Sequence, residues 1–251
     1  MNRAEPLHSL HAVVTGGGTG LGLAMARSFC SAGARVTIVG RREDRLHQAV
    51  AELDGNAGYV AADISDTAAS AGIAARLEAV APVDILVNNA GAHLKLPTLD
   101  TSDADFLRVL TTNLLGSFAL TREVAKPMCE RQSGSIIMIT SMASLFGIPQ
   151  VAAYTSSKAA LAGLTRQLAV EFGAAGVRVN AIAPGFIETD MNRDIFRKDP
   201  QRLEKILSRT PAGRLGAVED IAEAAVYLAS PAARFVTGVS LPVDGGISIG
   251  F

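Results

Sequence analysis

The chain has 251 residues, 49% of them hydrophobic and 19% charged, a composition that predicts one globular domain over residues 1–251. A formal net charge of −1 gives no indication of nucleic acid or of an anionic membrane as a partner. No segment approaches the roughly 18 continuous apolar residues of a transmembrane helix, and the N-terminus lacks a signal-peptide pattern, so we expect a cytoplasmic protein. Cys30 and Cys129 lack metal-ligand spacing and are expected to be buried, reduced thiols.

Short β-branched runs alternate along the chain with longer segments of helical apolar spacing. Helical periodicity is clearest over 22–33 and 157–173. Strands are predicted at 11–15, 35–39, 58–63 (the weakest), 84–88, 135–140, 177–182 and 239–243. Because apolar strands separated by helices form repeated βαβ units, the pattern predicts an α/β fold with a seven-stranded parallel sheet and helices on both faces.

The segment VVTGGGTGLGLAMA (13–26) follows the first strand and opens the first helix. Its glycines let the backbone turn tightly and approach a pyrophosphate, whose charge then lies at the helix N-terminus. A tight turn without any ligand would use the same residue types, but the strand–turn–helix context favours a nucleotide. The predicted cofactor contacts in this turn are Gly16, Gly18, Thr19, Gly20, Leu21 and Gly22.

The end of the second strand indicates which dinucleotide is bound. Gly40 stands where an acidic residue, roughly 20 positions beyond the glycine turn, would bind the ribose hydroxyls of NAD. Arg41 and Arg42 follow it, and a guanidinium group suits the 2′-phosphate of NADP. NADP(H) is therefore favoured and NAD(H) stays possible, since both arginines could instead be solvated residues that open a helix.

The segment YTSSK (154–158) places a tyrosine one helical turn before a lysine. An unperturbed tyrosine has a pKa of about 10, and moving it to near 7 takes roughly 4 kcal/mol. A unit charge about 4 Å away supplies on the order of 4 kcal/mol at an effective dielectric constant near 20. Lys158 is therefore expected to lower the pKa of Tyr154 and to make its hydroxyl a proton donor and acceptor.

Taken in order, these motifs resemble those of the short-chain dehydrogenase/reductase family along nearly the whole chain. The motifs that carry the resemblance are T-G-x-x-x-G-x-G (15–22), NNAG (88–91), Asn113, Ser141, YTSSK (154–158), PG (184–185) and VDGG (243–246). The resemblance implies a Rossmann-type, doubly wound sheet with strand order 3-2-1-4-5-6-7. It implies an NAD(P)(H)-dependent oxidoreductase that interconverts a secondary alcohol and a ketone by hydride transfer. It also implies a homotetramer, with the 101–130 and 155–173 helices pairing subunits.

The resemblance assigns roles to particular residues. Asn113, Ser141, Tyr154 and Lys158 would be catalytic, with Ser141 bonding the substrate oxygen and Asn113 holding a water in a proton relay. Tyr154 and Lys158 would also contact the cofactor. Further cofactor contacts would be Asp63 and Ile64 at the adenine, Asn89, Ala90 and Gly91 at the nicotinamide half, and Pro184, Gly185, Ile187 and Thr189 at the carboxamide. Asp63 could instead cap a helix, and Asn113 could bond local backbone.

The substrate stays open at this point. The irregular segment 186–215 is predicted to be a substrate lid, and Gln150, Phe186 and Met191 are candidate substrate contacts. The resemblance extends to 3-oxoacyl-carrier-protein reductases, which implies a 3-oxoacyl thioester or another small carbonyl, and to sugar-acid or polyol dehydrogenases. A non-catalytic NADP(H) sensor would be expected to have lost part of the catalytic set, whereas dehydration or epimerisation would show no net cofactor change. No metal site is expected.

Overall fold

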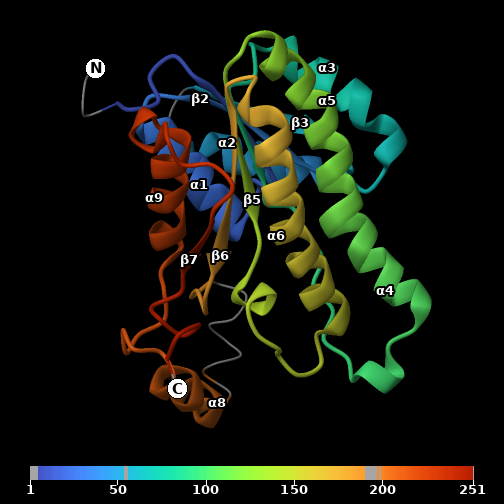
Figure 1. Cartoon of the computed structure of the whole chain (residues 1–251), viewed down its shortest axis with the longest axis vertical. Coiled ribbons are helices and arrows are strands. Elements are labelled where there is room, and N and C mark those ends of the chain that lie inside the picture. Colours follow the sequence, from blue (N-terminus) through green and yellow to red (C-terminus); the bar gives the residue numbers. More distant parts are fainter. Residues whose placement is uncertain (1–4, 54–55, 190–196, 198, 251) are drawn as a thin grey trace.

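The computed structural model describes residues 5–53, 56–189, 197 and 199–250, so the candidate substrate contact Met191 lies outside the described residues. Its centre is a seven-stranded parallel sheet in the order β3-β2-β1-β4-β5-β6-β7, which confirms the predicted order (Figure 1). The strands are β1 (His11–Thr15), β2 (Arg35–Gly40), β3 (Ala57–Ala61), β4 (Ile85–Asn88), β5 (Gly134–Ile139), β6 (Val177–Pro184) and β7 (Ser240–Val243).

Helices cover both faces of this sheet, as predicted, and two of the short turns between them bear on the site. The described α-helices are α1 (Gly20–Ser31), α2 (Glu43–Ala51), α3 (Ser70–Glu78), α4 (Asp103–Leu110), α5 (Gly116–Glu130), α6 (Ala152–Gly173), α8 (Pro200–Ser208) and α9 (Val218–Ala229). A π-helical turn, η3 (Thr111–Leu115), joins α4 to α5, and a 3₁₀ turn, η4 (Met142–Ser144), follows β5. None of the described helices has the length and hydropathy to cross a membrane.

The alternation of side chains along each strand builds two separate cores. In β1, Ala12 and Val14 pack into the core that α1, α2 and α9 cover, whereas Val13 packs into the core under α3, α5 and α6. Successive side chains of a strand point to opposite faces, so a strand that is covered on both sides is apolar throughout. The apolar runs of the sequence therefore translate directly into the central sheet.

Helix α6 begins at Ala152, so Tyr154 and Lys158 both lie within regular helix. The residue two positions earlier, Gln150, has a φ of 67°, a left-handed conformation that a right-handed helix cannot include. The helix therefore starts after this residue and before the TSS triplet that separates Tyr154 from Lys158.

The two cysteines are reduced thiols, as expected, but they are partly buried rather than buried. Each follows a fully buried residue, Phe29 for Cys30 and Met128 for Cys129. Both cysteines therefore lie at the edge of the buried stripe of their helix rather than at its centre.

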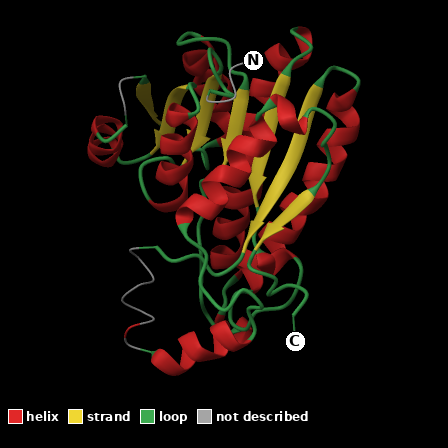
Figure 2. Ribbon diagram, turned by 90° about the vertical axis from the view of Figure 1, so that its left-hand side faces the viewer, coloured by secondary structure: helices red, strands yellow, loops and turns green. Residues whose placement is uncertain are grey.

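After β6 the chain leaves the sheet and returns to the same place. Gly216 donates its N–H to the carbonyl of Phe186 (2.9 Å), and Glu188 donates its N–H to the carbonyl of Gly216 (2.7 Å). The described part of this excursion includes α8, which lies beyond the carboxyl ends of the strands (Figure 2). Ligands of open α/β sheets bind at this end of the sheet, so α8 lies at the end of the sheet where ligands of such folds bind.

Candidate active site

The glycine turn forms a cradle at the N-terminus of α1. Gly16 and Gly20 have φ values of +66° and +54°, which L-residues rarely adopt. A methyl group on Gly22 would lie 2.2 Å from the carbonyl oxygen of Gly16, whereas one on Gly20 would enter open space. Thr19 makes no side-chain hydrogen bond to the helix, and the first turn holds no acidic residue. The helix N-terminus therefore keeps its positive potential for a pyrophosphate, and the residues present fit the predicted cofactor.

The NNAG segment, which follows the neighbouring strand β4, is hydrogen bonded to the start of this turn. The Thr15 hydroxyl accepts the N–H groups of Asn89 and Ala90, both at 3.0 Å, and the Asn89 amide donates to the Thr15 carbonyl at 2.9 Å. Thr15 was not among the predicted contacts. Its hydroxyl at the end of a buried strand was the signal that could have revealed it, because a buried hydroxyl needs partners.

The predicted adenine end brings together Arg41 and Asp63. An Arg41 nitrogen (Nη1) lies 3.8 Å from an Asp63 carboxylate oxygen. Desolvation acts to raise the pKa of Asp63, but hydrogen bonds from the Ser65 hydroxyl and N–H, with the charge of Arg41, lower it. Asp63 thus closes a turn on Ser65, while the cap of the following 3₁₀ helix is Asp66. Ile64 is buried beside Asp63.

Lys158 and Tyr154 face the end of β5. The Lys158 side chain is buried, and its ammonium lies 5.6 Å from the centroid of the Tyr154 ring and donates to the Ile139 carbonyl at 2.7 Å. Burial lowers the pKa of Lys158 to about 8. Burial raises the pKa of Tyr154, and the hydrogen bond with Ser141 opposes that rise. The expected lowering of the Tyr154 pKa by Lys158 is therefore wrong for this arrangement, because desolvation dominates and the ammonium is held by the Ile139 carbonyl.

Asn113 lies in the π-helical turn and is completely buried. Its Oδ1 accepts the Ala92 N–H at 2.6 Å, and its Nδ2 donates to the Ala92 carbonyl at 3.0 Å and to the Ser157 hydroxyl at 2.9 Å. Ser157 in turn donates to the Tyr154 carbonyl at 2.7 Å. These partners are distant in sequence, so the alternative of bonds to local backbone is wrong, and Ser157 is a site residue that the sequence analysis missed.

Gly91 brings this network close to the lysine. A side chain on Gly91 would begin 3.2 Å from Asn113 Oδ1 and 3.7 Å from Lys158 Nζ. The backbone of the NNAG segment therefore passes beside both polar groups, and a side chain on Gly91 would require Asn113 to shift by a few tenths of an ångström. Asn113, Tyr154 and Lys158 thus belong to one site, and the hydrogen bond to Tyr154 adds Ser141.

The predicted substrate and carboxamide contacts lie around this centre. Gln150 is exposed at the start of α6, and its carbonyl accepts the Leu96 N–H at 2.9 Å. On the other side, a side chain on Gly185 would begin 2.6 Å from the Asp244 backbone, so Pro184 and Gly185 lie against the VDGG segment. Ile187 is buried and Thr189 follows it in the excursion.

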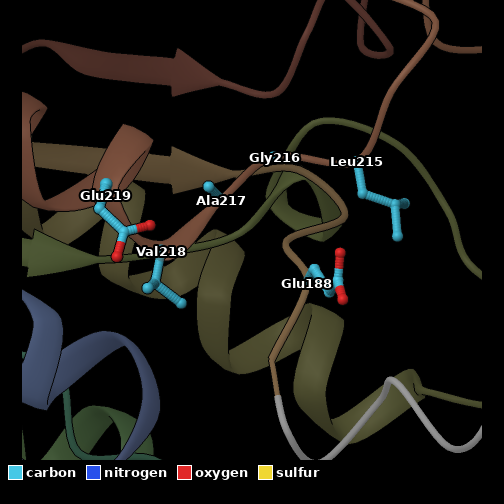
Figure 3. A pocket seen from close by; sticks show the side chains of 6 residues that line it. All are labelled: Glu188, Leu215, Gly216, Ala217, Val218 and Glu219. Carbon is cyan, nitrogen blue, oxygen red and sulfur yellow. The ribbon is translucent and has the colours of Figure 1, made fainter.

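A hollow beside Ile187 is lined by residues from both ends of the excursion (Figure 3). Glu188 and Leu215 lie at one end of it, and Val218 and Glu219 at the other. None of the four predicted catalytic residues lines it. Within the described residues, no group of three or more His, Cys, Asp or Glu side chains is arranged to hold a metal ion.

The fold and the site together define a dinucleotide-dependent dehydrogenase, and comparison with known proteins agrees. A family model described as enoyl-(acyl carrier protein) reductase matches residues 16–248. Galactitol 2-dehydrogenase (L-tagatose-forming) of Cereibacter sphaeroides is 43% identical over 241 residues, 95% of this chain and 94% of that protein. L-rhamnose 1-dehydrogenase (NAD(P)(+)) of Azotobacter vinelandii is 39% identical over 246 residues, 94% of this chain and 96% of that protein.

Among solved structures, a gluconate 5-dehydrogenase from Burkholderia cenocepacia J2315 in complex with NADP and tartrate is 34% identical, covers 99% of both chains and has a TM-score of 0.92. The chain belongs to the short-chain dehydrogenase/reductase family. Membership confirms the predicted Rossmann-type fold, the oxidoreductase class and the use of a nicotinamide cofactor. It does not by itself choose among a polyol, a sugar and a sugar acid, since similar relatives carry names of all three kinds.

Proposed function

We propose that this protein is an NADP(H)-dependent dehydrogenase that interconverts a secondary alcohol and a ketone on a small hydroxylated substrate. The observation that carries the proposal is the cluster of buried Ser141, Lys158 and Asn113 with partly buried Tyr154, next to the Gly91 backbone. A hydroxyl pair, a buried amine and a buried amide gathered in one place can move a proton to or from a substrate oxygen. The named relatives support a polyol, sugar or sugar acid over a 3-oxoacyl thioester.

The proton chemistry follows from the environments of these groups. In the reductive direction Tyr154 gives its proton to the ketone oxygen, while the Ser141 hydroxyl stabilises the charge that develops there. Lys158, whose pKa is about 8, then returns a proton to Tyr154. Asn113 and Ser157 hold the backbone on either side of this pair. In the oxidative direction the same groups carry the proton away.

The cofactor site is assigned to the glycine cradle and its surroundings. When bound, the cofactor supplies the hydride chemistry that the protein side chains lack. The N-terminus of α1 would hold the pyrophosphate, Arg41 and Arg42 the 2′-phosphate, and Asp63 the adenine. Gly40 supports the choice of NADP, because no carboxylate stands there to repel a phosphate.

Two measurements test this function. Tyr154→Phe removes the proton donor but not the cradle, so turnover should be lost while the Kd for NADPH stays within a few-fold of wild type. Retained turnover in this variant would contradict the mechanism. Arg41→Ala should raise the Kd for NADPH about tenfold or more and leave NADH nearly unchanged, since it removes one charge-assisted contact. Arg45→Ala, on the exposed side of α2, is the matched control.

Assembly into a homotetramer is part of the same proposal. Leu107, Leu115 and Phe118 are exposed along the helices at 101–130, and Val170 is exposed on α6. Exposed apolar side chains grouped on neighbouring helices are typical of subunit interfaces. Phe118→Asp should lower the mass measured by analytical ultracentrifugation, whereas Val80→Asp, at an exposed site on another helix end, should not. We also propose that segment 186–215 is a substrate lid and that the protein is cytoplasmic.

A further inference from the structure

The proposed catalytic tyrosine lies at the very beginning of its helix. Tyr154 is the third residue of α6, which starts at Ala152. Because the Cα–Cβ bonds of a helix tilt toward its N-terminus, a side chain in the first turn extends past the helix start. No earlier helical turn flanks it there, since Gln150 has a left-handed φ of 67°. The orientation of the Tyr154 ring therefore depends on another segment of the chain.

The loop after the NNAG segment supplies a ring that packs against this tyrosine. The centroid of the His93 imidazole lies 4.7 Å from that of the Tyr154 ring, with the two planes tilted by 57°. Aromatic rings attract one another at centroid separations of roughly 4.5–7 Å when they are tilted or offset. His93 is exposed to solvent, so burial of the imidazole does not explain where it lies. The contact with Tyr154 does.

The backbone on either side of His93 is fixed to the elements that carry the site. Before it, Ala92 donates its N–H to Asn113 Oδ1 at 2.6 Å, and its carbonyl accepts Asn113 Nδ2 at 3.0 Å. After it, the Leu96 N–H donates to the carbonyl of Gln150 at 2.9 Å, next to the start of α6. Asn113 is completely buried, so water does not compete for its two bonds to Ala92. The imidazole is therefore held in place relative to Tyr154.

We propose that His93 is a positioning residue for the reaction, whose imidazole holds the phenol ring of Tyr154 in the orientation that brings its hydroxyl to Ser141 and to the substrate oxygen. The inference rests on the proposed function, which makes Tyr154 the proton donor and acceptor. The contacts run from Asn113 to the Ala92 backbone, from there to His93, and from the imidazole to Tyr154. His93 exchanges no proton with the substrate, and its part is played by the ring and not by the ring nitrogens.

A residue of this kind affects the rate of the chemical step rather than binding. Proton transfer needs the Tyr154 hydroxyl at hydrogen-bond distance from the reacting oxygen, and a displacement of about 1 Å can cost on the order of 100-fold in rate. The proposed cofactor site lies at the glycine cradle and does not include His93. Loss of the imidazole should therefore lower kcat and leave KM and the Kd for NADPH nearly unchanged.

The kinetic test compares two substitutions of His93, with the most active of galactitol, glucitol and gluconate as substrate. His93→Ala removes the ring, whereas His93→Phe keeps a planar ring without nitrogen atoms. In His93→Ala, kcat should fall roughly 10- to 100-fold while KM and the Kd for NADPH stay within a few-fold of wild type. In His93→Phe, kcat should stay within a few-fold of wild type. His47→Ala, at an exposed histidine of α2, is the control and should change none of these constants.

A second readout follows the tyrosine ring without any turnover. The chain has three tyrosines and no tryptophan, so the contribution of Tyr154 to the near-UV circular dichroism is the difference between the wild-type and Tyr154→Phe spectra. A ring held by fixed packing gives such a band, and a ring that has lost its packing does not. The band should disappear in His93→Ala and be kept in His93→Phe and His47→Ala.

Three results would overturn the positioning role: a wild-type kcat in His93→Ala, an equal loss of kcat in the Ala and Phe variants, or a loss of kcat with the Tyr154 band unchanged. The last would mean that His93 acts on the substrate and not on the tyrosine. Failure of the proposed function would look different, since the wild type would then turn over no alcohol or ketone. In that case the spectra decide the matter: a Tyr154 band that His93→Ala loses and His93→Phe keeps supports the role of the ring, and an unchanged band in His93→Ala refutes it.

Discussion

The buried hydroxyl of Ser157 links two residues of the proposed site, and its removal should be costly. Ser157 is completely buried, accepts a hydrogen bond from Asn113 Nδ2 at 2.9 Å and donates one to the Tyr154 carbonyl at 2.7 Å. In Ser157→Ala, one N–H of Asn113 remains buried with no partner, which costs about 1–3 kcal/mol. For a chain of this size a loss of about 2 kcal/mol lowers Tm by roughly 4–8 °C.

The assay is thermal unfolding followed by steady-state kinetics on the same samples. Since Ser157 touches Asn113 and the Tyr154 backbone but none of the predicted cofactor contacts other than Tyr154, kcat should fall while the Kd for NADPH changes little. Ser156→Ala is the matched control, because Ser156 is the adjacent residue and is exposed. If the two variants have the same Tm and the same kcat, the Asn113–Ser157 bond does not hold the site together and the reasoning is refuted.

Two further predictions concern parts of the molecule away from the tyrosine. His11 is buried, is hydrogen bonded at both ring nitrogens and has a pKa lowered chiefly by burial. As the pH falls, the His11 side chain therefore takes up a proton in the unfolded chain before it does so in the folded protein. The free energy of unfolding that is present above about pH 6.5 should accordingly fall on acidification. Chemical unfolding at pH 7.5 and 5.5 should show a smaller fall in this free energy for His11→Gln than for the wild type or for the exposed control His47→Gln. Gly20→Ala should weaken NADPH binding, because its methyl group would extend into open space at the N-terminus of α1, where we propose that the pyrophosphate binds. Gly213→Ala is the control, since Gly213 has a similar positive φ and open space, and this change should lower stability alone. Equal Kd values for the two variants would contradict the proposed pyrophosphate site.

Much of this fold could be predicted because its signals are local. The apolar runs determine where the strands form. Glycine is required at position 22 because the carbonyl oxygen of Gly16, six positions earlier, lies too close to allow a side chain there. The four proposed catalytic residues were also predictable, through the spacing of the motifs that contain them. Their identities name the chemistry, but not the environment in which each side chain acts.

The parts that could not be predicted depend on contacts between distant segments. Ser157 reaches Asn113 across 44 positions, and Thr15 reaches Asn89 across 74. In YTSSK, no sequence pattern distinguishes the buried Ser157 from the exposed Ser156. Burial lowers the pKa of His93, and the charge of Arg202 adds to this because α8 lies beyond the strand ends. Such partners are decided by packing, which periodicity does not specify.

The relation between Lys158 and Tyr154 leads to a prediction about direction and pH. The pKa of Lys158 is about 8, and burial raises that of Tyr154 above its ordinary value of about 10. A proton passing from Lys158 to a Tyr154 phenolate therefore moves to the group with the higher pKa, which is energetically downhill. The pair is thus arranged to reload Tyr154 after it has protonated a ketone. Reductive kcat should accordingly fall as pH rises through about 8, where Lys158 loses its own proton. Lys158→Met should lose this step in the pH–rate profile along with most of its rate; a Met variant that keeps the same break near pH 8 would assign it to another group.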